Sequence, residues 1–228
     1  YPSDYYSYNT SALPNFLLWV TEQRDRFVTH TGGRVTGGLI TAIPRSVRTV
    51  FGINDSSGDV IEMLGELAIT PKARILDVGC GSGGLLDRLA RAGFENLCGA
   101  DPFLAADGET PMRVPLAKCY LEEVSQGDFD LIMFNHSFEH MPDPGATLKA
   151  ARERLSAAGV CLVRLPTTSS EVYSLYGVQW VGIDAPRHIF VPSRPGMAVA
   201  AEAAGLTVDR TFDDSSFLGF LGSEAYRH

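Results

Sequence analysis

The sequence has few cysteines, few basic residues and no long hydrophobic run among its 228 residues. A membrane-spanning helix needs about twenty consecutive apolar residues, and no stretch of that length is free of charged residues. The opening YPSDYYSYNT also lacks the basic region and apolar core that mark a secretory signal peptide. We therefore expect no membrane span and a cytoplasmic location.

The four cysteines form no C-x-x-C pair, which disfavours a zinc site built on thiolates. Each lies in or beside an apolar, strand-like run, as buried free thiols do in a reducing compartment. They are Cys80, Cys98, Cys119 and Cys161. The sequence thus predicts four free thiols and no metal site built on cysteine.

Basic residues are outnumbered: 19 Lys and Arg residues against 27 Asp and Glu residues give a formal net charge of -8. An acidic surface repels phosphate backbones, so nucleic acid is not an expected partner. The exception is residues 28–55, where Arg34, Arg45 and Arg48 precede the first acid, Asp55. This basic stretch is suited either to a phosphorylated ligand or to a solvated helical face, and the sequence alone leaves both open.

Short aliphatic runs alternate with amphipathic segments from residue 59 onward. The periodicity predicts helices over 13–27, 59–69, 83–93, 144–159 and 193–205. It predicts strands over 74–79, 96–101, 129–135, 159–166 and 206–212. Strands that alternate with helices indicate an α/β fold with a doubly wound parallel sheet, whose ligands bind beyond the carboxyl ends of the strands.

The stretch ILDVGCGSGG, residues 75–84, follows the first predicted strand and precedes a helix. Its glycines at 79, 81 and 84 match the G-x-G-x-x-G pattern of nucleotide-binding loops. Asp77 precedes them, and its carboxylate would repel a pyrophosphate at the helix N-terminus. It suits a ligand with cationic groups and no phosphate, such as S-adenosylmethionine, which carries an ammonium and a sulfonium. Asp101, after the second strand, is placed to accept hydrogen bonds from ribose hydroxyls, or to serve as a turn residue beside Pro102.

These motifs resemble those of class I S-adenosylmethionine-dependent methyltransferases, in the small-molecule branch related to ubiquinone methyltransferases. The resemblance rests on ILDVGCGSGGLLDRLARAG with LCGADP, on FDLIMFNHSFEHMPDP, on GVCLVRLPT and on LYGVQWVGIDAPRHIFVPSRPGM. It implies a Rossmann-like seven-stranded sheet, mostly parallel, with an antiparallel last strand that includes residues 217–222. The chain would then divide into an N-terminal arm and helical segment, 1–54, and a cofactor-binding domain, 55–228, with a lid insertion at about 167–192.

The resemblance also implies which residues hold S-adenosylmethionine, with S-adenosylhomocysteine as the product. The glycine loop would line the methionine end, and Asp101 would take the ribose. Two further segments would border the adenine, and the last residue of FDLIMFN would face the sulfonium. The expected cofactor-binding residues are Asp77, Gly79, Cys80, Gly81, Gly83, Asp101, Pro102, Phe103, Tyr120, Leu121 and Asn135.

Methyl transfer to a hydroxyl needs a base, and histidine has a pKa near working pH. His136 follows the strand FDLIMFN, and His188 lies in the insertion where this fold builds its acceptor pocket, so we predict one of them as the catalytic base. Glu139 and His140 lie on a turn similar to a metal-binding turn of ubiquinone-type members. That turn has an acid where His136 stands, so no metal is predicted. Structural roles stay open: His140 could bond backbone, and His188 could pack under the lid with Arg187 paired to an acid.

The insertion also carries Tyr173, Tyr176 and Trp180, which are suited to stacking on a planar acceptor or to packing the lid core. The predicted function is S-adenosylmethionine-dependent methyl transfer to a small-molecule acceptor. A hydroxyl of a sugar, a quinone-like compound or a secondary metabolite is favoured. Two alternatives stay open: a partner subunit that binds S-adenosylmethionine without catalysis, and an NAD-dependent oxidoreductase. The sequence is compatible with a homodimer but does not fix the oligomeric state.

Overall fold

The structure is a computed structural model that describes residues 14–44, 47, 59–213, 219–220 and 222–224. The α-helices are α1 (Asn15–Val28), α2 (Thr36–Ala42), α4 (Val60–Glu66), α5 (Gly84–Ala92), α6 (Pro144–Arg154), α7 (Glu171–Tyr176) and α8 (Arg194–Ala203). The strands are β1 (Arg74–Val78), β2 (Asn96–Ala100), β3 (Gly108–Glu109), β4 (Pro115–Ala117), β5 (Phe129–Asn135) and β6 (Leu155–Arg164). Short 3-10 helices are η2 (Leu121–Glu123), η3 (Phe138–His140), η4 (Gly177–Gln179) and η5 (Val181–Ile183). Among the described helices, none has the length and apolar character needed to cross a membrane.

The strands form one sheet in the order β3-β4-β2-β1-β5-β6. All neighbouring pairs run parallel except β3 and β4, which are antiparallel at one edge. From β1 the chain first builds outward through β2 to β4 and then returns to place β5 on the other side of β1. This reversal of strand order puts the expected ligand crevice at the carboxyl ends of β1 and β5.

The predicted seven-stranded sheet with an antiparallel last strand is wrong for the described residues, which form six strands with β3 antiparallel. Residues 206–212 form no strand. Most of them are exposed, so a strand there would bury little apolar surface, and the Arg210 guanidinium instead donates to the Glu66 carbonyl at 3.1 Å. Within the predicted strand 217–222, residues 219, 220 and 222 are helical, and the other positions lie outside the described residues.

The remaining predicted helices and strands are present, some with shifted ends. The predicted helix 144–159 ends at Arg154, and β6 begins at the next residue. The change occurs there because Leu155 pairs with Phe129 of β5 and is buried. The sequence did not predict β3 and β4, which are only two and three residues long.

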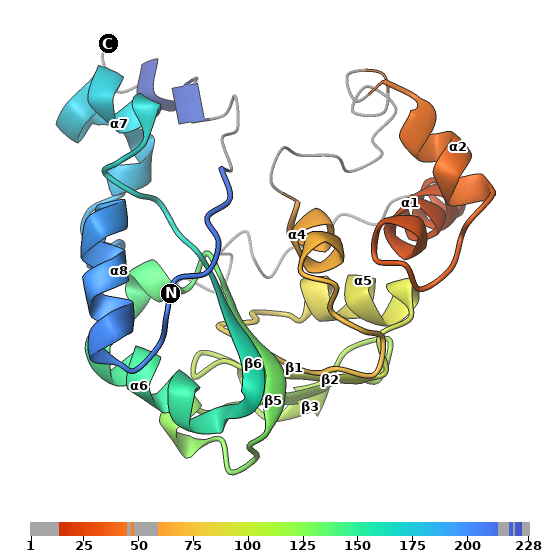
Figure 1. Cartoon of the computed structure of the whole chain (residues 1–228), viewed down its shortest axis with the longest axis horizontal. Coiled ribbons are helices and arrows are strands. Elements are labelled where there is room, and N and C mark those ends of the chain that lie inside the picture. Colours follow the sequence, from red (N-terminus) through yellow and green to blue (C-terminus); the bar gives the residue numbers. More distant parts are fainter. Residues whose placement is uncertain (1–13, 45–46, 48–58, 214–218, 221, 225–228) are drawn as a thin grey trace.

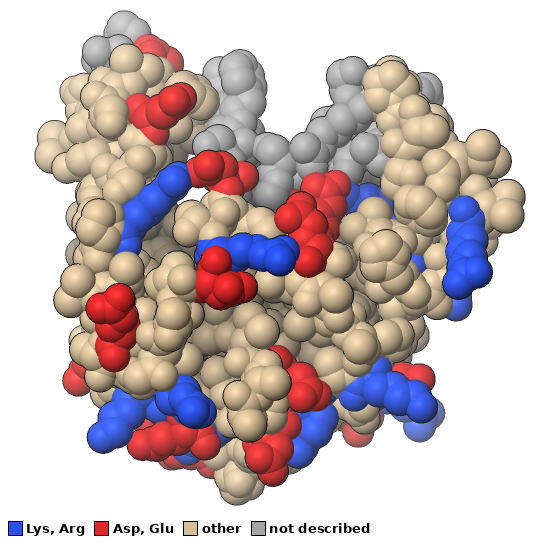
Figure 2. Space-filling view, viewed as in Figure 1, with Lys and Arg blue, Asp and Glu red and all other residues tan. Residues whose placement is uncertain are grey.

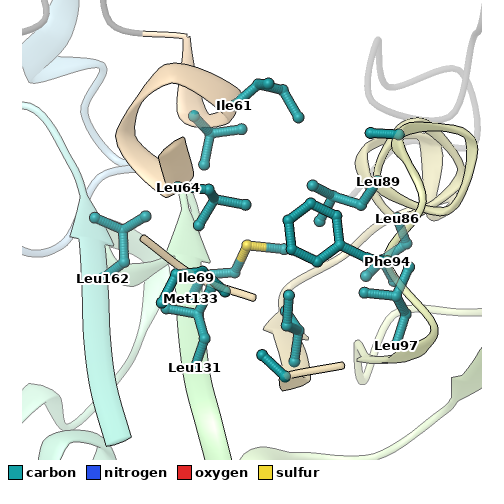
Figure 3. Packing of buried hydrophobic residues seen from close by; sticks show 14 of the residues in the cluster. Ile61, Leu64, Ile69, Leu86, Leu89, Phe94, Leu97, Leu131, Met133 and Leu162 are labelled. Carbon is teal, nitrogen blue, oxygen red and sulfur yellow. The ribbon is translucent and has the colours of Figure 1, made fainter. Parts of the chain in front are cut away.

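Helices cover both faces of the sheet (Figure 1). On one face, Ile61 and Leu64 of α4 and Leu86 and Leu89 of α5 pack with strand residues such as Met133 (Figure 3). On the other face, α6 and α8 pack against a second cluster of buried side chains. Each such side chain stabilises the fold by about 1.5–3 kcal/mol relative to leaving it exposed. The two clusters hold β1 and β5 in place from both sides.

Buried ion pairs join α1 to α4 and α5. Arg24 is fully buried and donates to Asp25 at 2.8 Å and to Asp59 at 2.9 Å. Arg88 of α5 approaches both of these carboxylates to 2.6 Å. Burial alone would raise the pKa of Asp59, but Arg88 and Arg24 together hold it below its usual value. Paired charges therefore fasten the N-terminal helix to the rest of the chain. The predicted boundary between an N-terminal segment, 1–54, and a cofactor-binding domain, 55–228, stays a prediction.

The four cysteines are free thiols, as predicted, but each is only partly buried. Burial raises the pKa of Cys98 to about 11 and that of Cys161 to about 12. Burial also raises the pKa of Cys80, in the glycine loop, and the carboxylates of Asp77 and Asp101 raise it further. Because the thiolate is the reactive form, these raised pKa values disfavour a reactive thiol near neutral pH.

Candidate active site

The glycine loop joins β1 to α5 and is held by backbone contacts. The Gly79 N–H donates to the Ala100 carbonyl at 2.7 Å, which ties the loop to the end of β2. Gly79 and Gly83 have φ of +75° and +77°, a backbone conformation that residues with a side chain rarely adopt. A Cβ at Gly79 would also lie 2.4 Å from the Cβ of Ser137. Both backbone conformation and close packing therefore require glycine at residue 79.

Asp77 is buried on β1, two residues before the loop begins, with 2% of its surface exposed. Its Oδ1 has no hydrogen-bond partner among the described residues. Burial, and secondly the nearby carboxylate of Asp101, raise the pKa of Asp77 to about 7. A buried carboxylate oxygen without a partner costs free energy. The position is therefore suited to a cationic ligand that brings the missing donor.

Asp101 follows β2 and contacts the same loop. Its Oδ2 accepts a hydrogen bond from the Gly81 N–H at 2.9 Å, and its Oδ1 accepts one from the Phe103 N–H at 2.8 Å. The bond to Phe103 is the turn role that the sequence left open, and the bond to Gly81 supports the glycine loop. A bond from Asp101 to a ribose stays a prediction.

A cavity of about 170 Å³ opens between the loop and the end of β5. It is lined by Asp77, Gly79, Cys80, Gly81, Ser82, Gly84, Leu85 and Asn135. Five of these are among the expected cofactor-binding residues. Ser82, Gly84 and Leu85 were not, although they belong to the same GCGSGGLL string and its spacing could have included them. Gly83 was also expected to bind the cofactor but does not line the cavity, and an added Cβ there would lie 2.4 Å from Cγ2 of Thr110.

The residues predicted to border the adenine follow the carboxyl ends of β2 and β4. Phe103 and Tyr120 are 55% and 52% exposed. Leu121 is buried in the core cluster beneath them. Pro102 is partly buried next to Asp101. None of the four lines the cavity, and their contact with an adenine stays a prediction.

The turn after β5 is fixed by two residues that the sequence did not single out. The Ser137 hydroxyl donates to the Val78 carbonyl at 2.5 Å, which pins the turn to β1. Arg164, at the end of β6, donates to the side-chain oxygen of Asn135 and accepts from the His136 N–H at 3.0 Å. These contacts join residues far apart in the sequence, so no local pattern announces them.

His188 is the more enclosed of the two predicted bases. Its Nδ1 lies 2.8 Å from the Gly182 carbonyl, so Nδ1 carries the proton and Nε2 has a free lone pair in the neutral ring. That Nε2 lies 3.9 Å from Oε1 of Glu139 and 3.7 Å from Oδ2 of Asp184. The His136 side chain is 50% exposed, and its Nδ1 lies 3.8 Å from the same Glu139 oxygen. The structure thus brings both predicted bases to one buried carboxylate.

The structural roles left open for the neighbouring residues are also present. Nδ1 of His140 lies 2.9 Å from the Arg187 carbonyl, and the Arg187 guanidinium pairs with Asp184 at 2.5 Å. The Glu139 carbonyl accepts a hydrogen bond from the Ile189 N–H at 2.9 Å. The segment predicted as a lid insertion is therefore fastened to the turn by backbone and side-chain bonds.

The lid aromatics pack against one another. Tyr176 and Trp180 are buried, and the rings of Tyr173 and Trp180 meet edge to face with centroids 6.0 Å apart. The Tyr176 hydroxyl donates to Glu224 at 2.6 Å. These contacts favour packing within the predicted lid over stacking on a planar acceptor.

One cluster in the described part of the chain has the composition of a cation site. Glu139, His140 and His188 each offer a ligand atom, and these atoms lie within 4.8 Å of one another. The second oxygen of Glu139, Oε2, has no hydrogen-bond partner among the described residues. The same arrangement suits a histidine base beside a carboxylate, and the absence of a metal stays a prediction.

The fold and the site define an α/β protein with a nucleotide-type glycine loop and a buried carboxylate at the carboxyl edge of a mostly parallel sheet. A family model described as a methyltransferase domain matches residues 43–211, which include the loop, the cavity and the lid. The chain belongs to this methyltransferase-domain family.

Similar curated proteins include ubiquinone biosynthesis O-methyltransferases. The one from Cereibacter sphaeroides (strain ATCC 17029 / ATH 2.4.9) is 31% identical over 126 residues, which cover 47% of this chain and 48% of that protein. The one from Acinetobacter baumannii (strain AYE) is 29% identical over 153 residues, which cover 59% of this chain and 64% of that protein. The chain thus spans less than two thirds of the length of either relative.

Two solved structures show the same fold. A mycolic acid cyclopropane synthase complexed with SAH and CTAB has a TM-score of 0.50 at 24% identity, covering 64% of this chain and 59% of that chain. A candidate methyltransferase from Bacillus halodurans C-125 has a TM-score of 0.52 at 14% identity, covering 65% of this chain and 69% of that chain.

Proposed function

We propose that this chain transfers a methyl group from S-adenosylmethionine to a small-molecule acceptor. The observation that carries the proposal is the unpartnered, buried Oδ1 of Asp77 at the wall of the glycine-loop cavity. The phosphates of a dinucleotide would meet that carboxylate at close range, whereas an ammonium group would supply its missing hydrogen bond. Membership of the methyltransferase-domain family supports this choice of ligand.

The residues of the site fit the parts of this cofactor. Asp77 would hold the ammonium, and the free N–H groups at the start of α5 would attract the carboxylate of the methionine end. Asp101 would accept from the ribose while it keeps its bond to Gly81. When bound, S-adenosylmethionine would supply a methyl carbon activated by its positively charged sulfur, with neutral S-adenosylhomocysteine as the leaving group.

His188 is the base that we assign to this reaction. Its Nδ1–H is directed at the Gly182 carbonyl, so Nε2 is the atom that takes the proton from an acceptor hydroxyl. Glu139 and Asp184, both within 4 Å of Nε2, would stabilise the imidazolium that results. General-base catalysis of this kind contributes about 10²–10⁴-fold to a rate. His136 is the second candidate and is more exposed.

The acceptor is proposed to be a hydroxyl compound: a sugar, a quinone-like molecule or a secondary metabolite. The name O-methyltransferase carried by the similar curated proteins supports oxygen as the methylated atom. The lid, fastened to the Glu139 turn, would exclude water from the reacting atoms, which favours a displacement in which charge is neutralised.

A crystal structure of the full chain grown with S-adenosylhomocysteine tests the proposal. We expect the amino group of the ligand against Asp77, its ribose hydroxyls against Asp101, and its sulfur at the Asn135 side of the cavity. A ligand bound there with its sulfur enclosed by protein and out of reach of any acceptor would support a non-catalytic partner subunit instead.

A further inference from the structure

Helix α1 buries charged as well as apolar side chains. Its buried residues are Val20, Thr21, Arg24 and Asp25, and the charges of the last two are held in the ion pairs described above. Phe16 and Trp19 are instead 69% and 47% exposed, and their rings stack with centroids 6.3 Å apart. Because surface helices normally turn their apolar side inward, the exposed aromatics of α1 need an explanation outside the core.

Helix α2 and its flanks add an exposed aliphatic row. Val35, Leu39, Ile43 and Val47 recur every four residues and are 75%, 67%, 40% and 40% exposed. Gly37 lies on the opposite side of α2, so close to α1 that an added Cβ would be 2.2 Å from the Gln23 carbonyl oxygen. The row therefore faces away from the packed side. In Figure 2 the surface over α2, at the upper right, is largely tan, with a blue basic patch below it at the right edge. We name these six side chains the N-terminal ridge: Phe16, Trp19, Val35, Leu39, Ile43 and Val47.

The ridge lies in the basic part of an otherwise acidic chain. Residues 14–54, which hold all six ridge side chains, contain five arginines and two acids, whereas the other 14 basic and 25 acidic residues give the remainder a net charge of -11. Arg24 is buried in ion pairs and Arg26 lies 3.5 Å from Glu22, while Arg45 and Arg48 lie outside the described residues. Arg34 is exposed, immediately before the row that begins at Val35.

We propose that the N-terminal ridge docks on an anionic lipid surface. Aromatic and branched aliphatic side chains enter the headgroup boundary of a bilayer, and arginines pair with anionic headgroups. The acidic remainder of the chain would be repelled by the same surface, which orients the ridge toward the lipid. A second copy of the chain is the less favoured occupant, because it would bring two basic segments together. This proposal does not depend on the methyl-transfer reaction.

The test uses Trp19 as a reporter in the full chain. The sequence has two tryptophans, so Trp180→Phe leaves only Trp19 to fluoresce. With vesicles of phosphatidylglycerol and phosphatidylcholine we expect a blue-shifted emission, quenched by brominated acyl chains. Vesicles of phosphatidylcholine alone and added salt should weaken the effect. Sedimentation of the unsubstituted chain with the same vesicles gives a second readout if Trp180→Phe disturbs the lid.

A charge placed on the ridge should abolish docking without unfolding the chain. Leu39→Glu is expected to lower vesicle partitioning at least about tenfold, since it removes one apolar contact and adds repulsion. The matched control is Val199→Glu on α8, where the side chain is 66% exposed and distant in sequence from the ridge. No vesicle binding at low salt, or an equal loss in the control, would overturn the proposal. A dimer that Leu39→Glu dissociates would assign the ridge to a second copy and overturn it as well.

Discussion

The carboxylate of Asp101 accepts a hydrogen bond from the Gly81 N–H at 2.9 Å. A residue that follows β2 therefore holds the glycine loop that follows β1 in its conformation. Asp101→Ala is expected to weaken S-adenosylhomocysteine binding by about 1–3 kcal/mol, the size of lost hydrogen bonds to a charged group. Calorimetric titration measures the change. Asp107→Ala is the control, because Asp107 also accepts from a backbone N–H, that of Lys118 at 2.7 Å, but is exposed. Equal affinities for the two variants would remove Asp101 from the site.

His188→Gln is expected to leave the affinity for S-adenosylhomocysteine near that of the wild type. Turnover should fall about 100-fold or more, because the acceptor hydroxyl loses its base. Binding is measured by calorimetry and turnover by transfer of a labelled methyl group. His136→Gln serves as the comparison at the more exposed histidine that also approaches Glu139. If His136→Gln slows turnover and His188→Gln does not, His136 is the base and His188 is not. If His188→Gln loses binding and turnover equally, His188 has a structural role instead.

The ion pairs under α1 should stabilise the fold strongly. Arg88→Ala is expected to lower the free energy of unfolding by about 3–5 kcal/mol, because the buried carboxylates of Asp25 and Asp59 lose a partner. Urea denaturation measures the loss, and Arg91→Ala, at an exposed position of the same helix, should change it little. A small effect for Arg88→Ala would mean that α1 is held by its apolar contacts.

The same pairs predict a pH dependence. The pKa of Asp59 is lowered in the folded chain, so its contribution to stability is complete above its usual pKa of 3.8. That contribution is lost as the pH falls through the lowered value. The stability gap between wild type and Arg88→Ala should therefore narrow below pH 4, which denaturation at pH 3 and pH 7 measures.

Much of this architecture follows from local patterns. β1, the glycine loop and α5 were predicted because an aliphatic run, a glycine string and an amphipathic helix are each encoded by adjacent residues. The Arg24 and Arg88 pairs were not, because they join residues up to 63 positions apart. Ser137 was missed for the same reason, since its partner is the Val78 carbonyl. The strand predicted over 206–212 is absent because that segment, although apolar enough for a strand, is largely exposed in the fold. The predicted last strand over 217–222 is wrong at residues 219, 220 and 222, which are helical.

Gly79→Ala should destabilise the chain and impair ligand binding together. The residue has φ of +75°, and a Cβ would lie 2.4 Å from that of Ser137. The strained conformation alone costs about 1–2 kcal/mol, and the turn after β5 must also shift. Gly108→Ala is the matched control, because an added Cβ there meets nothing within 4 Å. Thermal denaturation of both variants measures the difference; similar melting temperatures would show that the loop tolerates a side chain.

The central claim concerns Asp77, whose pKa burial raises to about 7. A bound ammonium favours the ionised carboxylate, so binding should release a proton below pH 7 and strengthen as the pH rises through that value. Asp77→Asn offers a neutral side chain of nearly the same shape. The variant should therefore bind S-adenosylhomocysteine more weakly, and its affinity should no longer rise with pH.

The most direct measurement is a calorimetric titration of the full chain with S-adenosylhomocysteine and with NADH, at pH 6 and pH 8 in buffers of different ionisation enthalpy. The account predicts that S-adenosylhomocysteine binds with proton release at pH 6 and that Asp77→Asn abolishes the release. It predicts no saturable binding of NADH. Tight binding of NADH, unaffected by Asp77→Asn, would contradict it.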